Sequence, residues 1–252
     1  MAARATERRS IHRGRWSGNL RQDRFTFRES GVSRYYLGRQ ARSYNMRLRV
    51  FTERTLSEAL AMVDFETLRR VAEREGRSPR MLDVACGTGV FLKQILELAP
   101  AIEAYGIDAS ADMLEQARAT LRGFPQAHLQ QVVVGDGETA TLPFAPGSFD
   151  LITCTNALHA MPDPLGALVE WKRLLTPGGH VALEDFARRG PPFPWRPFEW
   201  LVRRVVGESV HVYSLAEAKS LCREAGLRIV GEKAFRIDWL LHGWALRATE
   251  GA

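Results

Sequence analysis

From residue 80 onward, short apolar runs alternate with stretches whose apolar residues recur at helical spacing. The short runs predict strands, and the helical stretches predict helices. We expect strands at 80–85, 102–107, 129–134, 149–155 and 180–186, and helices at 90–98, 111–121 and 164–175. Strands that alternate with helices in this way are typical of a parallel sheet with helices on both faces.

After the fifth strand the pattern becomes irregular and then regular again. Four prolines between residues 191 and 197 predict a loop. Ser214 suits a helix start and Gly226 a helix end, so a helix is expected over 214–225. Two final strands, at 227–233 and 239–248, complete the expected fold, which is an α/β domain with a seven-stranded, mostly parallel sheet.

The first 79 residues divide into two parts. Residues 1–30 show no sustained apolar periodicity and predict a flexible extension, whereas 33–75 predict two or three helices. We therefore expect the extension 1–30, N-terminal helices within 31–79 that form a lid over a ligand, and one α/β domain over 80–252.

The positive charge is concentrated in that N-terminal part. Residues 1–49 hold thirteen arginines, no lysine and three acids, a net charge of +10, while the whole chain carries +6. An Arg-rich start is compatible with an organellar transit peptide, with a nucleic-acid or membrane contact, or with a loose leader. Arginine outnumbers lysine 31 to 4 over the whole chain, which indicates a coding bias and makes nucleic acid the less favoured partner.

The three cysteines, Cys86, Cys154 and Cys222, fit no zinc-binding spacing and no disulfide framework. We therefore expect no metal and a reducing compartment. The chain has no apolar run long enough to cross a membrane and no secretory signal, so the cytoplasm is the expected location, with organellar import through the Arg-rich start as the alternative. The sequence leaves the oligomeric state open.

The segment Leu82-Asp83-Val84-Ala85-Cys86-Gly87-Thr88-Gly89 carries the main chemical signal. A buried strand enters a glycine turn that opens a helix, so the backbone can approach a ligand and present unpaired N–H groups. Asp83 can accept from an ammonium group and would repel a pyrophosphate. Asp108 ends the second strand, where a carboxylate can accept from two ribose hydroxyls.

A dinucleotide-binding domain also combines a strand, a glycine turn, a helix and a later acid. That fingerprint requires a third glycine three residues after the second, and here Leu92 holds the position. The acid directly before the turn also argues against a pyrophosphate. A nicotinamide cofactor is therefore not expected.

Five elements in order give the chain a resemblance to class I methyltransferases, in particular the small-molecule branch with the ubiquinone and menaquinone C-methyltransferases. They are the glycine turn, Gly106-Ile107-Asp108, Gly135-Asp136-Gly137-Glu138, Leu142-Pro143-Phe144 with Ser148-Phe149-Asp150, and Leu175-Thr176-Pro177-Gly178-Gly179. The resemblance covers about residues 80–186 and implies a Rossmann-like fold and S-adenosylmethionine as cofactor. Ala85 departs from the pattern, because the family usually has the first turn glycine there.

The resemblance also implies roles for individual residues. The turn would hold the methionine part of the cofactor, Asp108 the ribose, Asp136 the adenine amino group and Met113 the adenine ring, while Tyr44 would fold over the cofactor. Without the motif, Met113 and Tyr44 would be interpreted as core or anchoring residues. The complete expected cofactor set is Tyr44, Asp83, Ala85, Cys86, Gly87, Gly89, Asp108, Ala109, Met113, Asp136, Gly137, Asn156 and Ala157.

The acceptor side is expected where the fourth strand ends. Asn156 would lie near the sulfonium end of the cofactor, and His159 is a candidate general base because histidine titrates near neutrality. The alternative for His159 is a capping or packing role. Residues 187–213 are the expected substrate-facing segment, with Trp195 and Tyr213 as candidate contacts because aromatic walls suit flat or lipophilic molecules.

Three functions remain open at this stage. The first is methyl transfer to a small aromatic or lipophilic metabolite, at oxygen or carbon. The second is methylation of RNA or protein with the Arg-rich start as recruiter, although the Asn/Asp-Pro-Pro-Tyr-type motif of base amino methylation is absent. The third is a cofactor-binding partner protein without catalysis.

Overall fold

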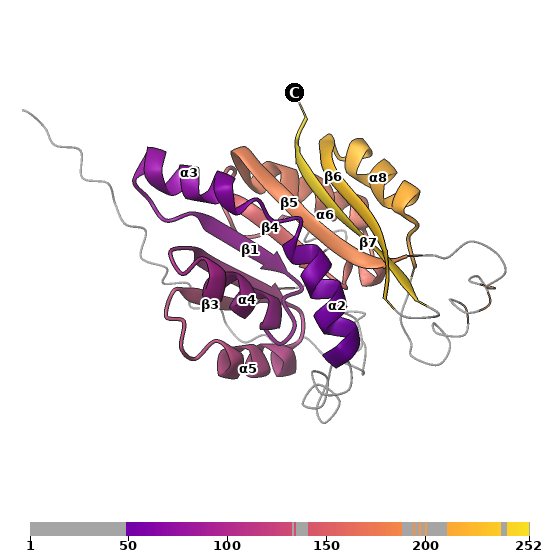
Figure 1. The fold of residues 1–252 in the computed structure, drawn as a ribbon, viewed down its shortest axis with the longest axis horizontal. Coiled ribbons are helices and arrows are strands. Elements are labelled where there is room, and N and C mark those ends of the chain that lie inside the picture. The colour runs from indigo at the N-terminus through magenta and orange to yellow at the C-terminus, as the bar shows by residue number, and fades with distance from the viewer. Residues whose placement is uncertain are drawn as a thin grey trace, which may run out of the picture.

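The computed structural model describes residues 49–132, 134, 141–187, 194, 197, 200, 211–237 and 241–251. Within them one seven-stranded sheet has the strand order β3-β2-β1-β4-β5-β7-β6 (Figure 1). The strands are β1 (Arg80–Val84), β2 (Glu103–Asp108), β3 (Ala127–Gln131), β4 (Phe149–Thr155), β5 (Leu175–Ala187), β6 (Leu227–Arg236) and β7 (His242–Glu250). All neighbouring pairs are parallel except those of β7 with β5 and β6. The expected fold, a Rossmann-like, mostly parallel sheet, is confirmed.

Helices cover both faces of the sheet because successive strand residues point to opposite sides. In β1, Met81 belongs to one hydrophobic cluster, and Leu82 and Val84 belong to the other. The Met81 side is covered by α2 (Arg49–Leu60), α3 (Phe65–Glu75), α4 (Val90–Leu98) and α5 (Ala111–Thr120). The Leu82 side is covered by α6 (Pro164–Leu174) and α8 (Leu215–Glu224), as Figure 1 also shows.

Side-chain caps explain where several helices begin. Ser110, Asp163 and Ser214 each accept a hydrogen bond from the backbone N–H three residues on, which satisfies a donor that the helix leaves open. At Ser214 the bond is reciprocal, because Glu217 returns its carboxylate to the Ser214 backbone. The expected helix over 214–225 is confirmed with its capping residue.

The N-terminal helices are confirmed in part. α2 and α3 lie in the expected range, and α2 packs on β5, β7 and β4. Figure 1 shows α2 beside the tip of the β1 arrow, near the carboxyl ends of the central strands. The remaining residues of this region, 33–48, lie outside the described residues, as does the extension 1–30.

Several strand boundaries differ from the prediction by one to three residues, and the start of β5 differs by five. β5 begins at Leu175 rather than at residue 180, because Leu175 already pairs with Phe149. Residues 176–179 bulge out between the pairs of Leu175 with Phe149 and His180 with Leu151. A side chain at Gly179 would lie 3.1 Å from the carbonyl oxygens of Phe149 and Asp150, so this glycine permits the bulge to lie close to β4. β3 ends at Gln131 and not at residue 134.

Candidate functional site at the carboxyl edge of the sheet

The turn after β1 has the backbone conformation that a ligand-binding loop needs. Ala85, Gly87 and Gly89 all have positive φ, at 57°, 54° and 75°. A side chain at Gly87 would meet nothing within 4 Å, so this part of the turn faces open space. Gly89 immediately precedes α4, so the turn directs the helix N-terminus at the same space.

Cys86 does not face that space. A side chain at Gly106 would lie 2.9 Å from the Cys86 sulfur, which shows that the thiol packs into the sheet. Burial raises the pKa of this thiol well above its usual range, so the thiolate is not formed near neutrality. Cys86 therefore contributes its backbone to the turn, and its N–H donates to the carbonyl of Ile107.

Asp83 is a buried acid one residue before the end of β1, and one of its carboxyl oxygens has no hydrogen-bond partner. Its Oδ1 accepts from the Thr153 hydroxyl at 2.6 Å, while Oδ2 has no hydrogen-bond partner. Burial raises the pKa of this carboxyl to about 7, and nearby Asp108 adds to the effect. A buried acceptor without a donor is costly, so this position suits a ligand that brings a donor or a positive charge.

Asp108 links the glycine turn to the start of α5. Its Oδ2 accepts from the N–H of Gly87 and its Oδ1 from that of Ser110, both at 2.8 Å. Each oxygen keeps a second lone pair, so the carboxylate can still receive two hydroxyl donors. The turn and the acid thus form one preorganised unit.

Two further expected cofactor residues follow Asp108. Met113 is 2% exposed and lies in the first turn of α5, where its backbone N–H donates to the hydroxyl of the capping residue Ser110. The carbonyl of Ala109 accepts from the Gln131 side chain at 2.8 Å. Both therefore lie between the end of β2 and the first turn of α5, close in sequence to Asp108.

Asn156 follows β4 in a strained conformation, with φ at 52°. Its side-chain amide donates to Thr55 of α2 at 2.9 Å, and its Oδ1 has no partner. Ala157 comes next, directly before the short helix η2 (Leu158–Ala160). Non-glycine residues with positive φ are frequent at functional sites, which makes Asn156 a candidate site residue. Its hydrogen bond to Thr55 connects α2 to this position.

His159 lies in η2 and is held by Asp185 of β5. The ring Nδ1 is 2.7 Å from Oδ1 of Asp185, and the backbone N–H of His159 donates to Oδ2 at 2.8 Å. Because a carboxylate can only accept, the ring bond places the proton on Nδ1 and makes Nε2 the basic nitrogen. This pair has the geometry of a base and its orienting acid.

The other expected acceptor contacts are placed only in part. The N–H of His211 donates to the carbonyl of His159, so the segment 211–213 runs beside the histidine. The Tyr213 ring lies 4.5 Å from that of His211, and its carbonyl accepts from Trp244. Four expected site residues lie outside the described residues: Tyr44, Asp136, Gly137 and Trp195.

Sequence reasoning missed three residues at this edge, namely Asp185, Thr55 and Glu184. Asp185 and Glu184 follow one another in β5 and point to opposite faces, one to His159 and the other toward α2. The available signal was a pair of acids at the end of an otherwise apolar strand. Its meaning depends on the strand order, which puts β5 beside β4.

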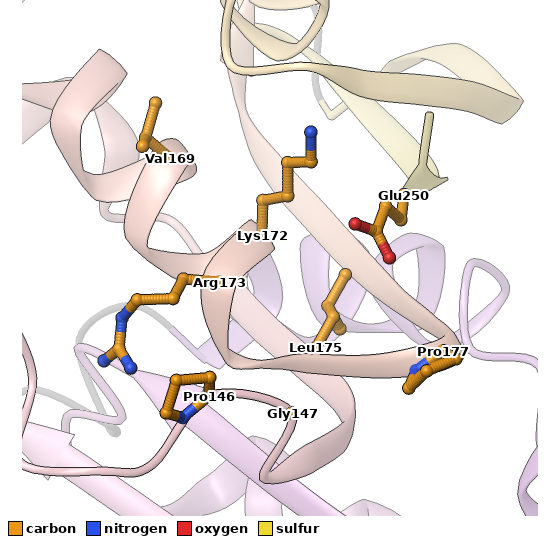
Figure 2. A pocket seen from close by; sticks show the side chains of 8 residues that line it. All are labelled: Pro146, Gly147, Val169, Lys172, Arg173, Leu175, Pro177 and Glu250. Atoms are coloured by element: carbon orange, nitrogen blue, oxygen red, sulfur yellow. The ribbon is translucent and has the colours of Figure 1, made fainter. Parts of the chain in front are cut away.

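A separate surface groove of about 530 Å³ lies at the opposite edge of the sheet (Figure 2). Gly147 and Leu175 line it near the amino ends of β4 and β5, together with Lys172 and Glu250. None of the expected site residues lines this groove. Open α/β sheets bind ligands at the carboxyl ends of their strands, so the groove is not the candidate site.

Comparison with known proteins agrees with the geometry. Residues 82–183 match a family model described as a methyltransferase domain. This segment contains the glycine turn, Asp108, Asn156 and His159. Residues 82–183 are therefore identified as a methyltransferase domain of the class I, S-adenosylmethionine-dependent type.

Individual relatives share part of this domain. A demethylmenaquinone methyltransferase of Lactococcus lactis is 32% identical over 56% of this chain and 54% of its own length. A 27-O-demethylrifamycin SV methyltransferase of Amycolatopsis mediterranei is 32% identical over 69% of this chain and 62% of its own. The chain thus spans about half to three fifths of these relatives.

A solved structure extends the likeness to the fold. An S-adenosylmethionine-dependent methyltransferase from Mesorhizobium loti superimposes with a TM-score of 0.58 at 20% identity, over 75% of this chain and 94% of its own. At that identity the match concerns the fold alone.

The described helices include none that is long and apolar enough to cross a membrane.

S-adenosylmethionine fits the residues of the methyltransferase domain. Its ammonium group can supply the donor that Asp83 Oδ2 lacks, and its ribose hydroxyls can use the remaining lone pairs of Asp108. The open space at Gly87 leaves room for the ligand to approach the turn.

Proposed function

We propose that this protein transfers a methyl group from S-adenosylmethionine to a small aromatic or lipophilic acceptor, at oxygen or carbon. The observation that carries the proposal is the pair of His159 and Asp185 at the carboxyl edge of β4 and β5, the strands that follow β1 in the sheet order. The relatives named for demethylmenaquinone and demethylrifamycin support the acceptor class, because both names denote small ring-containing molecules.

Asp83, Asp108 and the backbone of the glycine turn would hold the cofactor, which supplies an electrophilic methyl carbon on a good leaving group. The chain then has to hold the acceptor in line with that carbon and exclude water. Tyr213, beside His211 and the His159 carbonyl, is proposed to border the acceptor, and Trp195 stays a prediction.

His159 would take the proton that a hydroxyl or carbon acid loses on methylation. Asp185 orients the imidazole through two bonds to His159 and stabilises the positive ring after proton transfer. Nδ1 is occupied by Asp185, so Nε2 is the nitrogen that receives the proton. His159 is 7% exposed, which keeps bulk water from competing as the base.

The test is a methyl-transfer screen against quinones, phenols and polyketide-like acids, with RNA and protein as further acceptors. With the best small acceptor, His159→Ala should lower turnover by roughly 10²–10⁴ and leave the dissociation constant of S-adenosylmethionine nearly unchanged. His128→Ala is the matched control, because His128 is half-exposed on β3, away from Asp185. Transfer to RNA or protein alone would contradict the acceptor class, and full activity of a stable His159→Ala protein would remove the base.

The three cysteines are buried and free in the structure, which supports a reducing compartment. We therefore propose the cytoplasm as the location. Imaging of the full chain with a C-terminal tag tests this, since import through the Arg-rich start would place the signal in an organelle.

A further inference from the structure

Buried side-chain oxygens without a hydrogen-bond donor lie near the carboxyl ends of three neighbouring strands. They are Oδ2 of Asp83 on β1, Oδ1 of Asn156 after β4, and both carboxyl oxygens of Glu184 on β5. All three residues lie toward the carboxyl edge, and β4 stands between β1 and β5. No donor among the described residues forms a hydrogen bond with these atoms, although the Asn156 N–H acts to lower the raised pKa of Glu184. In its ionised form this row accepts hydrogen bonds and attracts positive charge.

Glu184 is the member that the expected cofactor contacts do not explain. It is 1% exposed, and its strand neighbours are Thr155 of β4 and Ala245 of β7. Its carbonyl accepts from the N–H of Asn156 at 2.9 Å, so it is tied directly to the strained residue at the site. Burial raises the pKa of this carboxyl well above its usual range, with further contributions from Asp185 and Glu58.

Glu58 of α2 provides an informative contrast, because it is a similarly buried acid in the same region. It is 4% exposed, but Arg54 lies 3.1 Å and Lys233 2.5 Å from its carboxyl oxygens. The charge of Glu58 is thus compensated within the protein, whereas Glu184 has no such cation among the described residues. Without a cation the raised pKa keeps the Glu184 carboxyl protonated, so it would ionise when a cationic ligand binds beside it.

The strand order arranges the acids along the edge as Asp108 on β2, Asp83 on β1 and Glu184 on β5. If Asp108 holds the ribose and Asp83 the ammonium group, the methyl group on the sulfur would point toward β4 and β5. We propose that Glu184 supplies the negative charge that makes the site prefer methyl-loaded, cationic S-adenosylmethionine over its neutral-sulfur product, S-adenosylhomocysteine. This inference rests on the proposed methyl transfer. It assigns to Glu184 a role in the exchange of the spent cofactor for a loaded one.

Asp83 and Glu184 would then have separable effects. The ammonium group is present in both cofactor forms, so Asp83 attracts both alike. The positive sulfur is present only in the loaded form, so Glu184 acts on that form alone. After transfer the attraction to Glu184 disappears, which favours release of the product and its replacement by fresh cofactor.

Calorimetric titration of the full chain with S-adenosylmethionine and with S-adenosylhomocysteine tests the proposal without any methyl acceptor. Glu184→Gln should weaken binding of the loaded form by about tenfold and leave binding of the product unchanged. Asp83→Asn should weaken both forms by a similar factor. Glu170→Gln is the matched control, because Glu170 is a buried acid of α6 that is paired with Arg173. It should leave the ratio of the two dissociation constants at the wild-type value.

Glu184→Asp keeps the charge and should retain most of the wild-type ratio, which separates charge from packing if Glu184→Gln is unstable. Equal affinities of wild type and Glu184→Gln for both forms would overturn the proposal, as would an equal loss for both. A wild-type protein that binds both forms and methylates none of the screened acceptors would contradict the proposed function but leave this test intact.

Discussion

Arg77 holds Asp150 in a two-pronged ion pair at the start of β4, with nitrogen–oxygen distances of 2.7 and 2.8 Å. The same carboxylate accepts from the N–H of Arg80 and from the hydroxyl of Thr176, so it joins β1, β4 and β5 at the edge opposite the site. Asp150 is 1% exposed. Its role is to fix the central strands on which the site depends.

Arg77→Ala should therefore lower the free energy of unfolding by about 3 kcal/mol near neutrality, because it leaves a buried carboxylate without its cation. Arg80→Ala is the control, since its side chain makes only a surface pair with Glu103 and should cost under about 1 kcal/mol. Urea unfolding of both variants measures the difference. Equal losses would show that the Asp150 pair has no special weight.

The difference in unfolding free energy between wild type and Arg77→Ala should disappear at acidic pH. Burial opposes ionisation of Asp150, but the bonds from Arg77, Arg80 and Thr176 prevail and lower its pKa below the usual 3.8. A lowered pKa means that the stabilisation is present above about pH 4 and is lost as the pH falls through the folded-state value. The gap between wild type and Arg77→Ala should close on acidification, and a gap independent of pH would contradict this.

Asp83 should have the opposite pH dependence. Its pKa is raised from 3.8 to about 7 by burial and by Asp108, so its favourable contribution is complete below about pH 4 and is lost as the pH rises through 7. Between about pH 5 and pH 8, cofactor-free wild type should lose roughly 2–3 kcal/mol relative to Asp83→Asn. Urea titrations at both pH values measure this, and parallel stability curves would show that Asp83 stays ionised.

Asp108→Ala should weaken binding of S-adenosylmethionine by about 1–3 kcal/mol, because two charge-assisted bonds to the ribose would be lost. The same change removes the bonds to Gly87 and Ser110, so unfolding must be measured alongside. Asp112→Ala, on the adjoining first turn of α5, is a control that keeps the Asp108 carboxylate. An unchanged dissociation constant in a folded Asp108→Ala protein would mean that Asp108 does not bind the ribose.

The turn after β1 should respond differently to two substitutions. Ala85 has a positive φ, which costs an ordinary residue about 1–2 kcal/mol, so Ala85→Gly should leave stability unchanged or slightly higher despite the greater freedom of glycine. Gly89→Ala should destabilise the protein, because the new methyl group would lie 3.1 Å from Leu121 and 3.2 Å from Ala117. Thermal unfolding compares the two, and a large loss for Ala85→Gly would contradict the strain argument.

The centre of the sheet was predictable because β1, β2 and β4 are short, largely buried strands that alternate with helices. The start of β5 was not, since Thr176-Pro177-Gly178-Gly179 has the composition of a turn. Those residues form a bulge between the pair of Leu175 with Phe149 and the pair of His180 with Leu151. Gly178 has a positive φ of 85°, and Gly179 has no side chain to obstruct the carbonyls of Phe149 and Asp150. Local composition cannot reveal a close approach between strands that are far apart in sequence.

The candidate site was predictable to the extent that it is local. Asp83, the glycine turn and Asp108 belong to one strand–turn–helix–strand unit, and the structure joins them through the bond from Gly87 to Asp108. The partnership of His159 with Asp185 spans 26 residues, and that of Asn156 with Thr55 spans 101. Both depend on which strands and helices become neighbours, which periodicity does not specify.

The position of β7 in the sheet has a consequence for folding during synthesis on the ribosome. β7 is the last strand in sequence, yet it lies between β5 and β6 and pairs with both. Until residue 250 has emerged, the nascent chain exposes two strand edges that have no partner, and such edges readily pair with other chains. The sheet can therefore close only after its seventh strand has been synthesised, and until then the two open edges favour misassembly with other chains.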